Sequence, residues 1–238
     1  MANNKTGKVE RKNSLLVKIY LLAYNFLQVV GWSYILYQLV NFYYKNEHEK
    51  NTLWNNVHIS VIIFQNAAAL EIIHAVFGLV KSNPVVTTFQ VLSRVMVVCG
   101  VIIATPVTYA AASPGLPLAL FAWSITEIIR YGYYFANLVG HVPHFLVWLR
   151  YTTFIVLYPI GVTGELLCFY AATKYTNLNQ KAYSYTLPNT WNFTFSYHYF
   201  LIIVMLLYIP LFPQLYLHMF SQRKKALGAN EKISKKVN

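Results

Sequence analysis

Two side chains that can transfer protons lie seven residues apart in one apolar stretch of the chain. The stretch covers residues 149–165, reads LRYTTFIVLYPIGVTGE, and contains Tyr158 and Glu165. Seven residues make about two helical turns, so a helix would place the phenol and the carboxyl on one face within roughly 10 Å. A carboxylate at membrane depth costs about 2.5–3.5 kcal/mol on insertion scales, so it usually faces the protein interior and marks a site. The pair could therefore act as a general acid and a general base.

The composition of the chain indicates that these residues belong to a membrane protein. Of 238 residues, 57% are hydrophobic, and the mean hydropathy is +0.42. The apolar residues form long blocks rather than short alternations, and a membrane-spanning helix needs about 20 of them. We therefore predict an all-α, polytopic integral membrane protein with about six transmembrane helices. The blocks cover approximately residues 15–44, 57–80, 86–111, 116–139, 145–172 and 196–220.

The net charge of +12 arises mainly from two tails and short loops, so it indicates membrane topology and argues against binding to nucleic acid. We predict a cytosolic basic tail over residues 1–14, a six-span membrane domain over residues 15–220 and a second cytosolic basic tail over residues 221–238. Residues 1–14 lack the pattern of a cleaved signal peptide, so we expect the first span to be retained. Lys235 and Lys236, near the carboxyl end, resemble the dilysine signal of the endoplasmic reticulum membrane.

Further charged residues lie inside the apolar blocks. Glu71, Glu127 and Glu165 are three of only seven acidic residues, and the sequence contains no Asp. Arg94 lies in the third block, where it needs a buried partner, and either Glu71 or Glu127 could provide one. Arg130 follows Glu127 by three residues, which allows an ion pair on one helix and predicts a wider polar network at membrane depth.

Residues that disturb helical backbone lie between Tyr158 and Glu165. Pro159 and Gly161 are expected to kink or loosen the helix beside Tyr158. Broken helices are frequent at membrane active sites and transport sites. The only paired histidines, His141 and His144, lie in a short loop without Cys or carboxylate neighbours, so we expect no metal and no cofactor.

Four separate motifs resemble one enzyme family. They are LEIIHAVFGLV at 70–80, QVLSR at 90–94, WSITEIIRY at 123–131 and the stretch at 149–165. Together they resemble the very-long-chain (3R)-3-hydroxyacyl-CoA dehydratase family, also called protein tyrosine phosphatase-like or PASTICCINO2-like. The resemblance implies dehydration of 3-hydroxyacyl-CoA to trans-2-enoyl-CoA, the third step of the very-long-chain fatty acid elongation cycle. It also implies a long-chain 3-hydroxyacyl-CoA substrate, contact with the lipid bilayer and contact with other elongation enzymes.

The resemblance assigns roles to individual positions. Tyr158 and Glu165 fall on the catalytic tyrosine and glutamate of the family. Positions that support activity in the dehydratase family correspond in this sequence to Arg94, Glu127, Arg130, Arg150 and Gly161. We expect Glu165 to take the C2 proton and Tyr158 to protonate the departing C3 hydroxyl, with exchanged roles as the alternative. Arg150 either meets the phosphates of CoA or anchors its span at the positively charged side.

The residues alone exclude one other function and leave two open. A phosphatase is excluded, because Ala75 follows His74 where the older family name implies a nucleophilic cysteine. A small-solute transporter and a non-catalytic binding or scaffold protein of the elongation complex are the remaining alternatives. For the intramembrane acids, including Glu71 beside His74, the alternative is an interhelical polar network that stabilises packing only.

Overall fold

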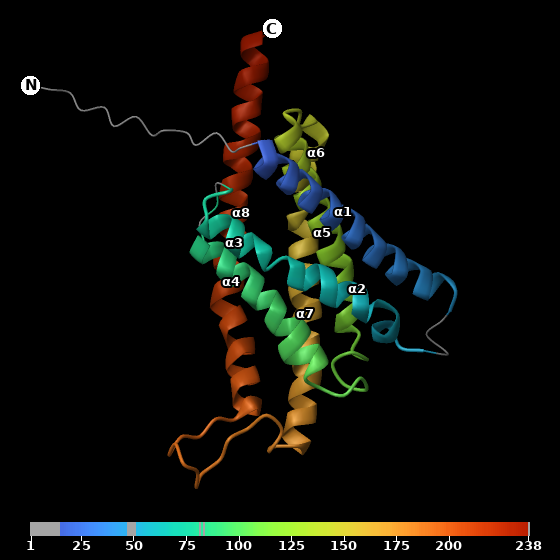
Figure 1. Cartoon of the computed structure of the whole chain (residues 1–238), viewed down its shortest axis with the longest axis vertical. Coiled ribbons are helices and arrows are strands. Elements are labelled where there is room, and N and C mark those ends of the chain that lie inside the picture. Colours follow the sequence, from blue (N-terminus) through green and yellow to red (C-terminus); the bar gives the residue numbers. More distant parts are fainter. Residues whose placement is uncertain (1–14, 47–50, 81, 83, 238) are drawn as a thin grey trace, which may run out of the picture.

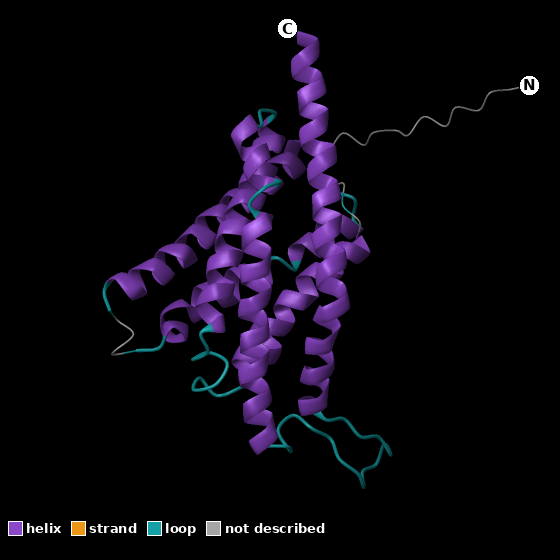
Figure 2. Cartoon of the chain, turned by 180° about the vertical axis from the view of Figure 1, so that it is seen from behind, coloured by secondary structure: helices purple, strands orange, loops and turns teal. Residues whose placement is uncertain are grey.

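The computed structural model describes residues 15–46, 51–80, 82 and 84–237, so the predicted basic tail over residues 1–14 lies outside the described part. The described residues form helices joined by loops (Figure 2), and their only β contact is an isolated antiparallel bridge between Tyr185 and Phe195. The prediction of an all-α protein is confirmed. The elements are α1 (Leu15–Tyr44), α2 (Leu53–Ala67), α3 (Leu70–Val76), α4 (Pro84–Val95), the π-helix η2 (Met96–Ile103), α5 (Gly115–Val139), α6 (His144–Arg150), α7 (Phe154–Leu178) and α8 (Tyr197–Val237).

Four helical stretches of the described chain are long and apolar enough to cross a membrane. They are Leu15–Tyr44, Leu53–Val76, His144–Leu178 and Tyr197–Gly228. Helix α5 has 25 residues but is not among these four, and Thr87–Ile103 is apolar but shorter. The composition and length of these helices therefore indicate a polytopic membrane protein. Helix length and hydropathy do not confirm the predicted count of about six spans.

Several predicted blocks differ from the helices at their ends. The second block is divided between α2 and α3, and the third ends at Ile103 rather than near residue 111. The last helix does not stop near residue 220 but continues to Val237, so Pro210 and Pro213 lie in its interior. These residues after 220 are polar, and hydropathy alone does not report that a helix continues beyond the bilayer.

The helical chain is interrupted before Pro159, the residue expected to kink or loosen the helix. Helix α7 runs through Pro159 without interruption, and the break lies between α6 and α7, at residues 151–153. Proline lacks an N–H, so the carbonyl of Ile155 loses its helical partner four residues on. The Tyr216 hydroxyl of α8 donates a hydrogen bond to this carbonyl at 2.9 Å. The neighbouring helix thus satisfies the backbone that proline leaves open, as is usual for prolines in membrane helices.

The segments α1, α2–α3, α4–η2, α5, α6–α7 and α8 run alternately in opposite directions through the bundle (Figure 1). Helix α1 begins at the end of the bundle where α8 finishes, and the loop between α7 and α8 lies at the other end. Helix α5 packs against both α1 and α7, whereas α8 packs mainly on α7. Helices α5 and α7 therefore occupy the middle of the arrangement and meet the others on both sides.

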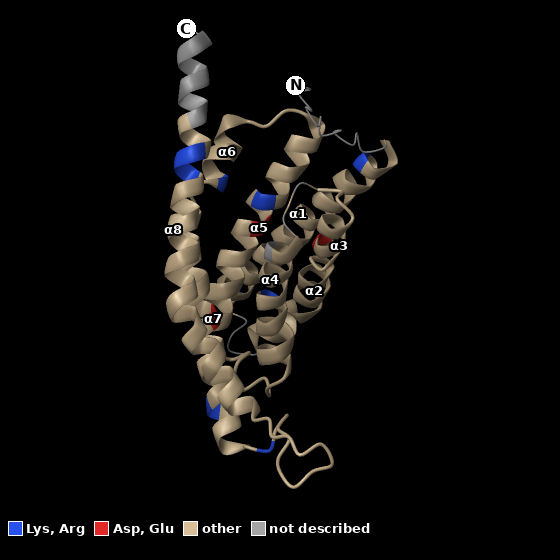
Figure 3. Cartoon of the chain, turned by 90° about the vertical axis from the view of Figure 1, so that its left-hand side faces the viewer, with Lys and Arg blue, Asp and Glu red and all other residues tan. Residues whose placement is uncertain are grey.

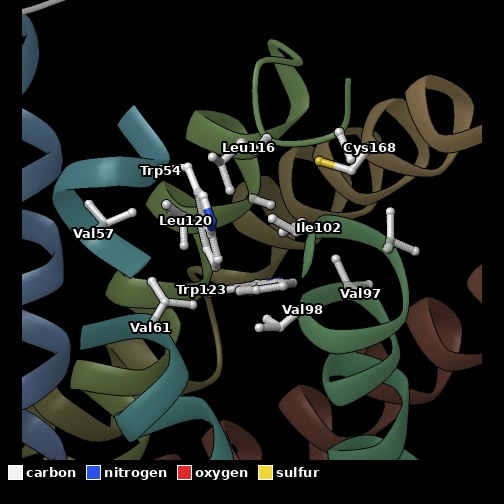
Figure 4. Packing of buried hydrophobic residues seen from close by; sticks show 14 of the residues in the cluster. Trp54, Val57, Val61, Val97, Val98, Ile102, Leu116, Leu120, Trp123 and Cys168 are labelled. Atoms are coloured by element: carbon white, nitrogen blue, oxygen red, sulfur yellow. The ribbon is translucent and has the colours of Figure 1, made fainter. Parts of the chain in front are cut away.

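A buried hydrophobic core fills the space between α1, α2, η2, α5 and α7. Figure 4 shows Trp123 of α5 close to Val98 and Ile102 of η2. Of the described side chains of α8, by contrast, Tyr197 and Leu201 at its beginning are the buried hydrophobic ones. In lipid the outside of a helix is as apolar as the core, so tight packing rather than exclusion of water holds the bundle together.

The backbones of α5 and α7 approach each other closely. A Cβ atom built on Gly164 would lie 2.5 Å from the backbone nitrogen of Ala119 and 2.7 Å from the carbonyl oxygen of Gly115. Such distances leave no room for a side chain, so glycine is required for the two backbones to approach. Small residues on both helices therefore determine the separation of α5 and α7.

We expect Gly164→Ala to lower the stability of the protein by about 1–3 kcal/mol, because the new methyl group must push the two helices apart. Gly132→Ala is the matched control, since a Cβ at Gly132 meets nothing within 4 Å. There the substitution should be neutral or stabilising by up to about 1 kcal/mol, because alanine favours helix. Thermal unfolding of both variants in one detergent measures the difference, and equal melting temperatures would contradict the close-packing argument.

Candidate active site

Glu165 lies on α7 between two hydrogen-bond donors from neighbouring helices. The indole Nε1–H of Trp123, on α5, donates to Oε1 of Glu165 at 2.8 Å. The hydroxyl of Tyr208, on α8, donates to Oε2 at 2.8 Å. Both carboxyl oxygens are therefore engaged by neutral donors, and the group faces protein rather than lipid.

Tyr158 lies on the same side of α7, against aromatic rings of α8. Its ring stacks on Phe212 with a centroid distance of 5.1 Å and on Tyr216 with a distance of 5.9 Å, both at an interplanar angle of 6°. Tyr216 also donates the hydrogen bond to the Ile155 carbonyl, which lacks a helical partner because of Pro159. One side chain of α8 therefore both satisfies this carbonyl and stacks on Tyr158. The phenol of Tyr158 is thus oriented by α8.

The two candidate residues share the surface where α7 meets α8. Tyr158 contacts Phe212, and Glu165 contacts Tyr208, one helical turn earlier on α8. The Tyr158 hydroxyl makes no hydrogen bond to another described residue, so it can donate to a ligand. A phenol and a carboxyl in this arrangement can supply an acid and a base to one bound molecule.

A network of ion pairs joins α3, α4 and α5, and Figure 3 shows charged residues on these helices. Arg94 donates a hydrogen bond to Glu127, which is buried, and Arg130 donates from Nε to Glu127 at 2.7 Å. Arg130 also donates to both carboxyl oxygens of Glu71, each at 2.8 Å, and the Tyr131 hydroxyl donates to Glu71 as well. Of the two partners expected for Arg94, Glu127 is the one that pairs with it. Paired and hydrogen-bonded, these charges can be accommodated at membrane depth.

Trp123 connects this network to Glu165. The guanidinium carbon of Arg94 lies 5.7 Å from the centre of the Trp123 ring, within the range of a cation–π interaction. The same indole donates its N–H to Glu165. Trp123 therefore contacts both Arg94 and Glu165.

The other two predicted supporting residues lie in different places. Gly161 packs on α5, where an added Cβ would lie 3.3 Å from the Cβ of Ala122, so it helps α7 to approach the helix that carries Trp123. Arg150 ends α6, apart from the network, and its guanidinium carbon lies 4.3 Å from the centre of the Tyr133 ring. In the part of the chain that the structure describes, no three of His, Cys, Asp and Glu are placed to hold a metal ion.

The residues that hold the candidate pair in place were not identified from the sequence. Tyr208, Phe212 and Tyr216 recur every fourth residue, which puts them on one face of a helix. This spacing was a usable signal for an aromatic face on the last helix. Which helix it would meet depends on the tertiary structure, as does the choice of Trp123 among five tryptophans.

Comparison with known proteins gives a consistent set of relatives. The family model described as "Protein tyrosine phosphatase-like protein, PTPLA" matches residues 65–229. Very-long-chain (3R)-3-hydroxyacyl-CoA dehydratase 2 of Mus musculus is 44% identical over 216 residues, covering 91% of this chain and 84% of the mouse protein. Dehydratase hpo-8 of Caenorhabditis elegans is 45% identical over 217 residues, covering 91% and 98%, respectively. Dehydratase PASTICCINO 2A of Oryza sativa subsp. japonica is 36% identical over 216 residues, covering 90% and 96%. No solved structure matches the chain.

We expect Glu127→Leu to destabilise the protein by about 3–5 kcal/mol, because it leaves the Arg94 guanidinium without its buried partner. Arg94→Leu removes the other half of the pair. The double variant should lose less than the sum of the single variants, since no unpaired charge remains. Unfolding of the three variants in detergent completes the cycle, and strictly additive losses would show that the two residues do not interact.

Proposed function

This chain belongs to the protein tyrosine phosphatase-like (PTPLA) family, and we propose that it catalyses the reaction after which its relatives are named, the dehydration of very-long-chain (3R)-3-hydroxyacyl-CoA. The product would be trans-2-enoyl-CoA, and the enzyme would be a hydro-lyase of fatty acid elongation. The observation that carries the proposal is the phenol of Tyr158 and the carboxyl of Glu165 on the one surface of α7 that meets α8. A phosphatase remains excluded, since the catalytic thiolate is missing from its position.

The proposed reaction needs one proton removed and one delivered at adjacent carbons. Glu165 takes the proton from C2, and the electrons of that C–H bond form the C2=C3 double bond while the C3–O bond breaks. Tyr158 gives its proton to the departing hydroxyl, which leaves as water. The proton then passes from Glu165 back to the Tyr158 phenolate, which restores both groups. Exchanged roles would balance equally well.

The neighbours of Glu165 support its part in this scheme. Two neutral donors, Trp123 and Tyr208, orient the carboxylate without a cation in direct contact. An arginine salt bridge such as that of Glu127 would hold the group firmly in its charged form, whereas an indole and a phenol leave it able to exchange a proton. The apolar surface around the pair suits a fatty acyl chain, which gains about 0.8 kcal/mol for each buried CH₂.

The finer topology is part of the proposal. The successive segments α1, α2–α3, α4–η2, α5, α6–α7 and α8 alternate in direction, which supports six crossings. With six crossings, residues 1–14 and residues 221–238 lie on one side, and the excess of Lys and Arg there favours the cytosol. Residues 221–237 are helical and continue α8. We keep the endoplasmic reticulum membrane and contact with other elongation enzymes as predictions.

We expect Tyr158→Phe and Glu165→Gln each to lower kcat by about 10²–10⁴-fold, since each removes a proton-transfer group. The protein is purified in detergent, supplied with a long-chain 3-hydroxyacyl-CoA, and the enoyl-CoA product is quantified by mass spectrometry. Tyr170→Phe is the control, because Tyr170 is a half-exposed tyrosine of the same helix. If wild type forms no enoyl product, or if both variants match it, the catalytic assignment is wrong.

We expect Tyr208→Phe and Trp123→Phe to reduce kcat/KM by about tenfold, because each removes one hydrogen bond to Glu165 worth about 1–2 kcal/mol. The loss should be smaller than that of Glu165→Gln, and adding both substitutions to Glu165→Gln should cost little more. A full additional tenfold loss in the combined variant would mean that the two donors act independently of Glu165.

A further inference from the structure

Arg150 is held in a way that leaves one nitrogen of its guanidinium group without a hydrogen-bond partner among the described residues. Its guanidinium carbon lies 4.3 Å from the ring centre of Tyr133 and 4.7 Å from that of Tyr134, and Nη2 donates to the Tyr134 hydroxyl at 3.3 Å. The Nη1 atom is buried and has no hydrogen-bond partner among the described residues. A buried charged donor without a partner costs free energy, so the arrangement points to a group that is absent from the structure.

A second arginine with the same property lies nearby on α8. Phe154, at the start of α7, contacts Phe220 with a ring-centroid distance of 5.2 Å. Arg223 lies nearly one turn beyond Phe220, and Arg150 lies four residues before Phe154, across the break between α6 and α7. The Nε atom of Arg223 is also buried without a partner among the described residues. Figure 3 shows the basic residues of α8 at the level of α6.

No carboxylate among the side chains that the structure describes pairs with this group. The side chains of Lys224 and Lys225 are exposed next to Arg223. Each of the acids Glu71, Glu127 and Glu165 has its partners elsewhere, and no described ion pair includes Arg150 or Arg223. Two arginines with free donors and two lysines suit a ligand that carries several negative charges.

The position of the group relates it to the candidate pair. Arg223 follows Tyr216 by seven residues, so it lies on the face of α8 that meets Tyr158, about 10 Å further along the helix. Arg150 precedes Tyr158 by eight residues. The seam between α7 and α8 therefore leads from Glu165, past Tyr158, to a cluster of basic side chains. A thioester held at the pair would have its cofactor end in this direction.

We infer that Arg150 and Arg223, with Lys224 and Lys225 beside them, bind the phosphate groups of CoA in the thioester substrate. This inference rests on the proposed function. The pantetheine arm runs along the α7–α8 seam and places the thioester at Tyr158 and Glu165, while the phosphates meet the guanidinium nitrogens at the end of the bundle. A phosphate could also come from an anionic lipid headgroup, so the test separates the two sources.

The first test measures binding of CoA itself, which needs no turnover. Wild type and variants are placed in nanodiscs of phosphatidylcholine, and CoA is titrated by calorimetry. Arg150→Gln and Arg223→Gln should each weaken CoA binding about tenfold or more, because each removes charge-assisted hydrogen bonds to phosphate. Lys174→Gln is the matched control: Lys174 also lies over a tyrosine ring, 4.6 Å from the centre of Tyr170, but near the other end of α7. Equal CoA affinity in wild type and both arginine variants would overturn the inference.

The second test separates phosphate binding from a structural role and from a lipid site. The ratio of kcat/KM for a 3-hydroxyacyl-CoA to that for the same acyl-pantetheine, which lacks the nucleotide, should fall about tenfold in Arg150→Gln, and Arg150→Lys should restore part of it. An unchanged ratio would contradict the inference. If phosphatidic acid in the nanodisc binds wild type better than Arg150→Gln while CoA binds both alike, the ligand is lipid and the inference fails. If wild type binds CoA but forms no enoyl-CoA product, the proposed function is contradicted instead.

Discussion

A charge at membrane depth must find its partners inside the protein, and this constraint determines how the bundle is assembled. Arg130 contacts both Glu71 and Glu127, so α3 and α5 are tied together, and Arg94 adds α4. Removal of any one of these groups leaves a buried charge that costs several kcal/mol. In lipid, where apolar surfaces do not distinguish one neighbour from another, such polar contacts have a large share in selecting the helix arrangement.

Glu127 and Glu165 have different hydrogen-bond and ion-pair partners. Glu127 is buried between two arginines, which hold it as an anion with a structural task. Glu165 accepts hydrogen bonds from an indole and a phenol, without a cation in contact. One fold thus contains a carboxylate that stabilises packing and another that suits proton transfer, because the environment rather than the residue type decides the role.

Helix α8 supplies contacts to the two candidate residues that α7 itself does not provide. Pro159 leaves the Ile155 carbonyl unpaired, and Tyr216 satisfies it while its ring stacks on Tyr158. The position of the phenol therefore depends on a hydrogen bond that a different residue at 159 would make unnecessary. On the α5 side of α7, close packing of the two helices positions Glu165 in turn, because it brings Trp123 within hydrogen-bond distance of the carboxylate.

The sequence by itself determined the fold class, the approximate extent of the long apolar blocks, and the surface of α7 on which Tyr158 and Glu165 lie, because hydropathy and helical spacing are properties of local sequence. It also indicated that Arg94 must pair with a buried acid. Only the tertiary structure decided that the acid is Glu127, that α7 stays helical through Pro159, and that Trp123 and Tyr208 hold Glu165. Those outcomes depend on which helices are neighbours. The hydrophobic pattern of a helix that is apolar on most faces does not indicate which helix packs against each face.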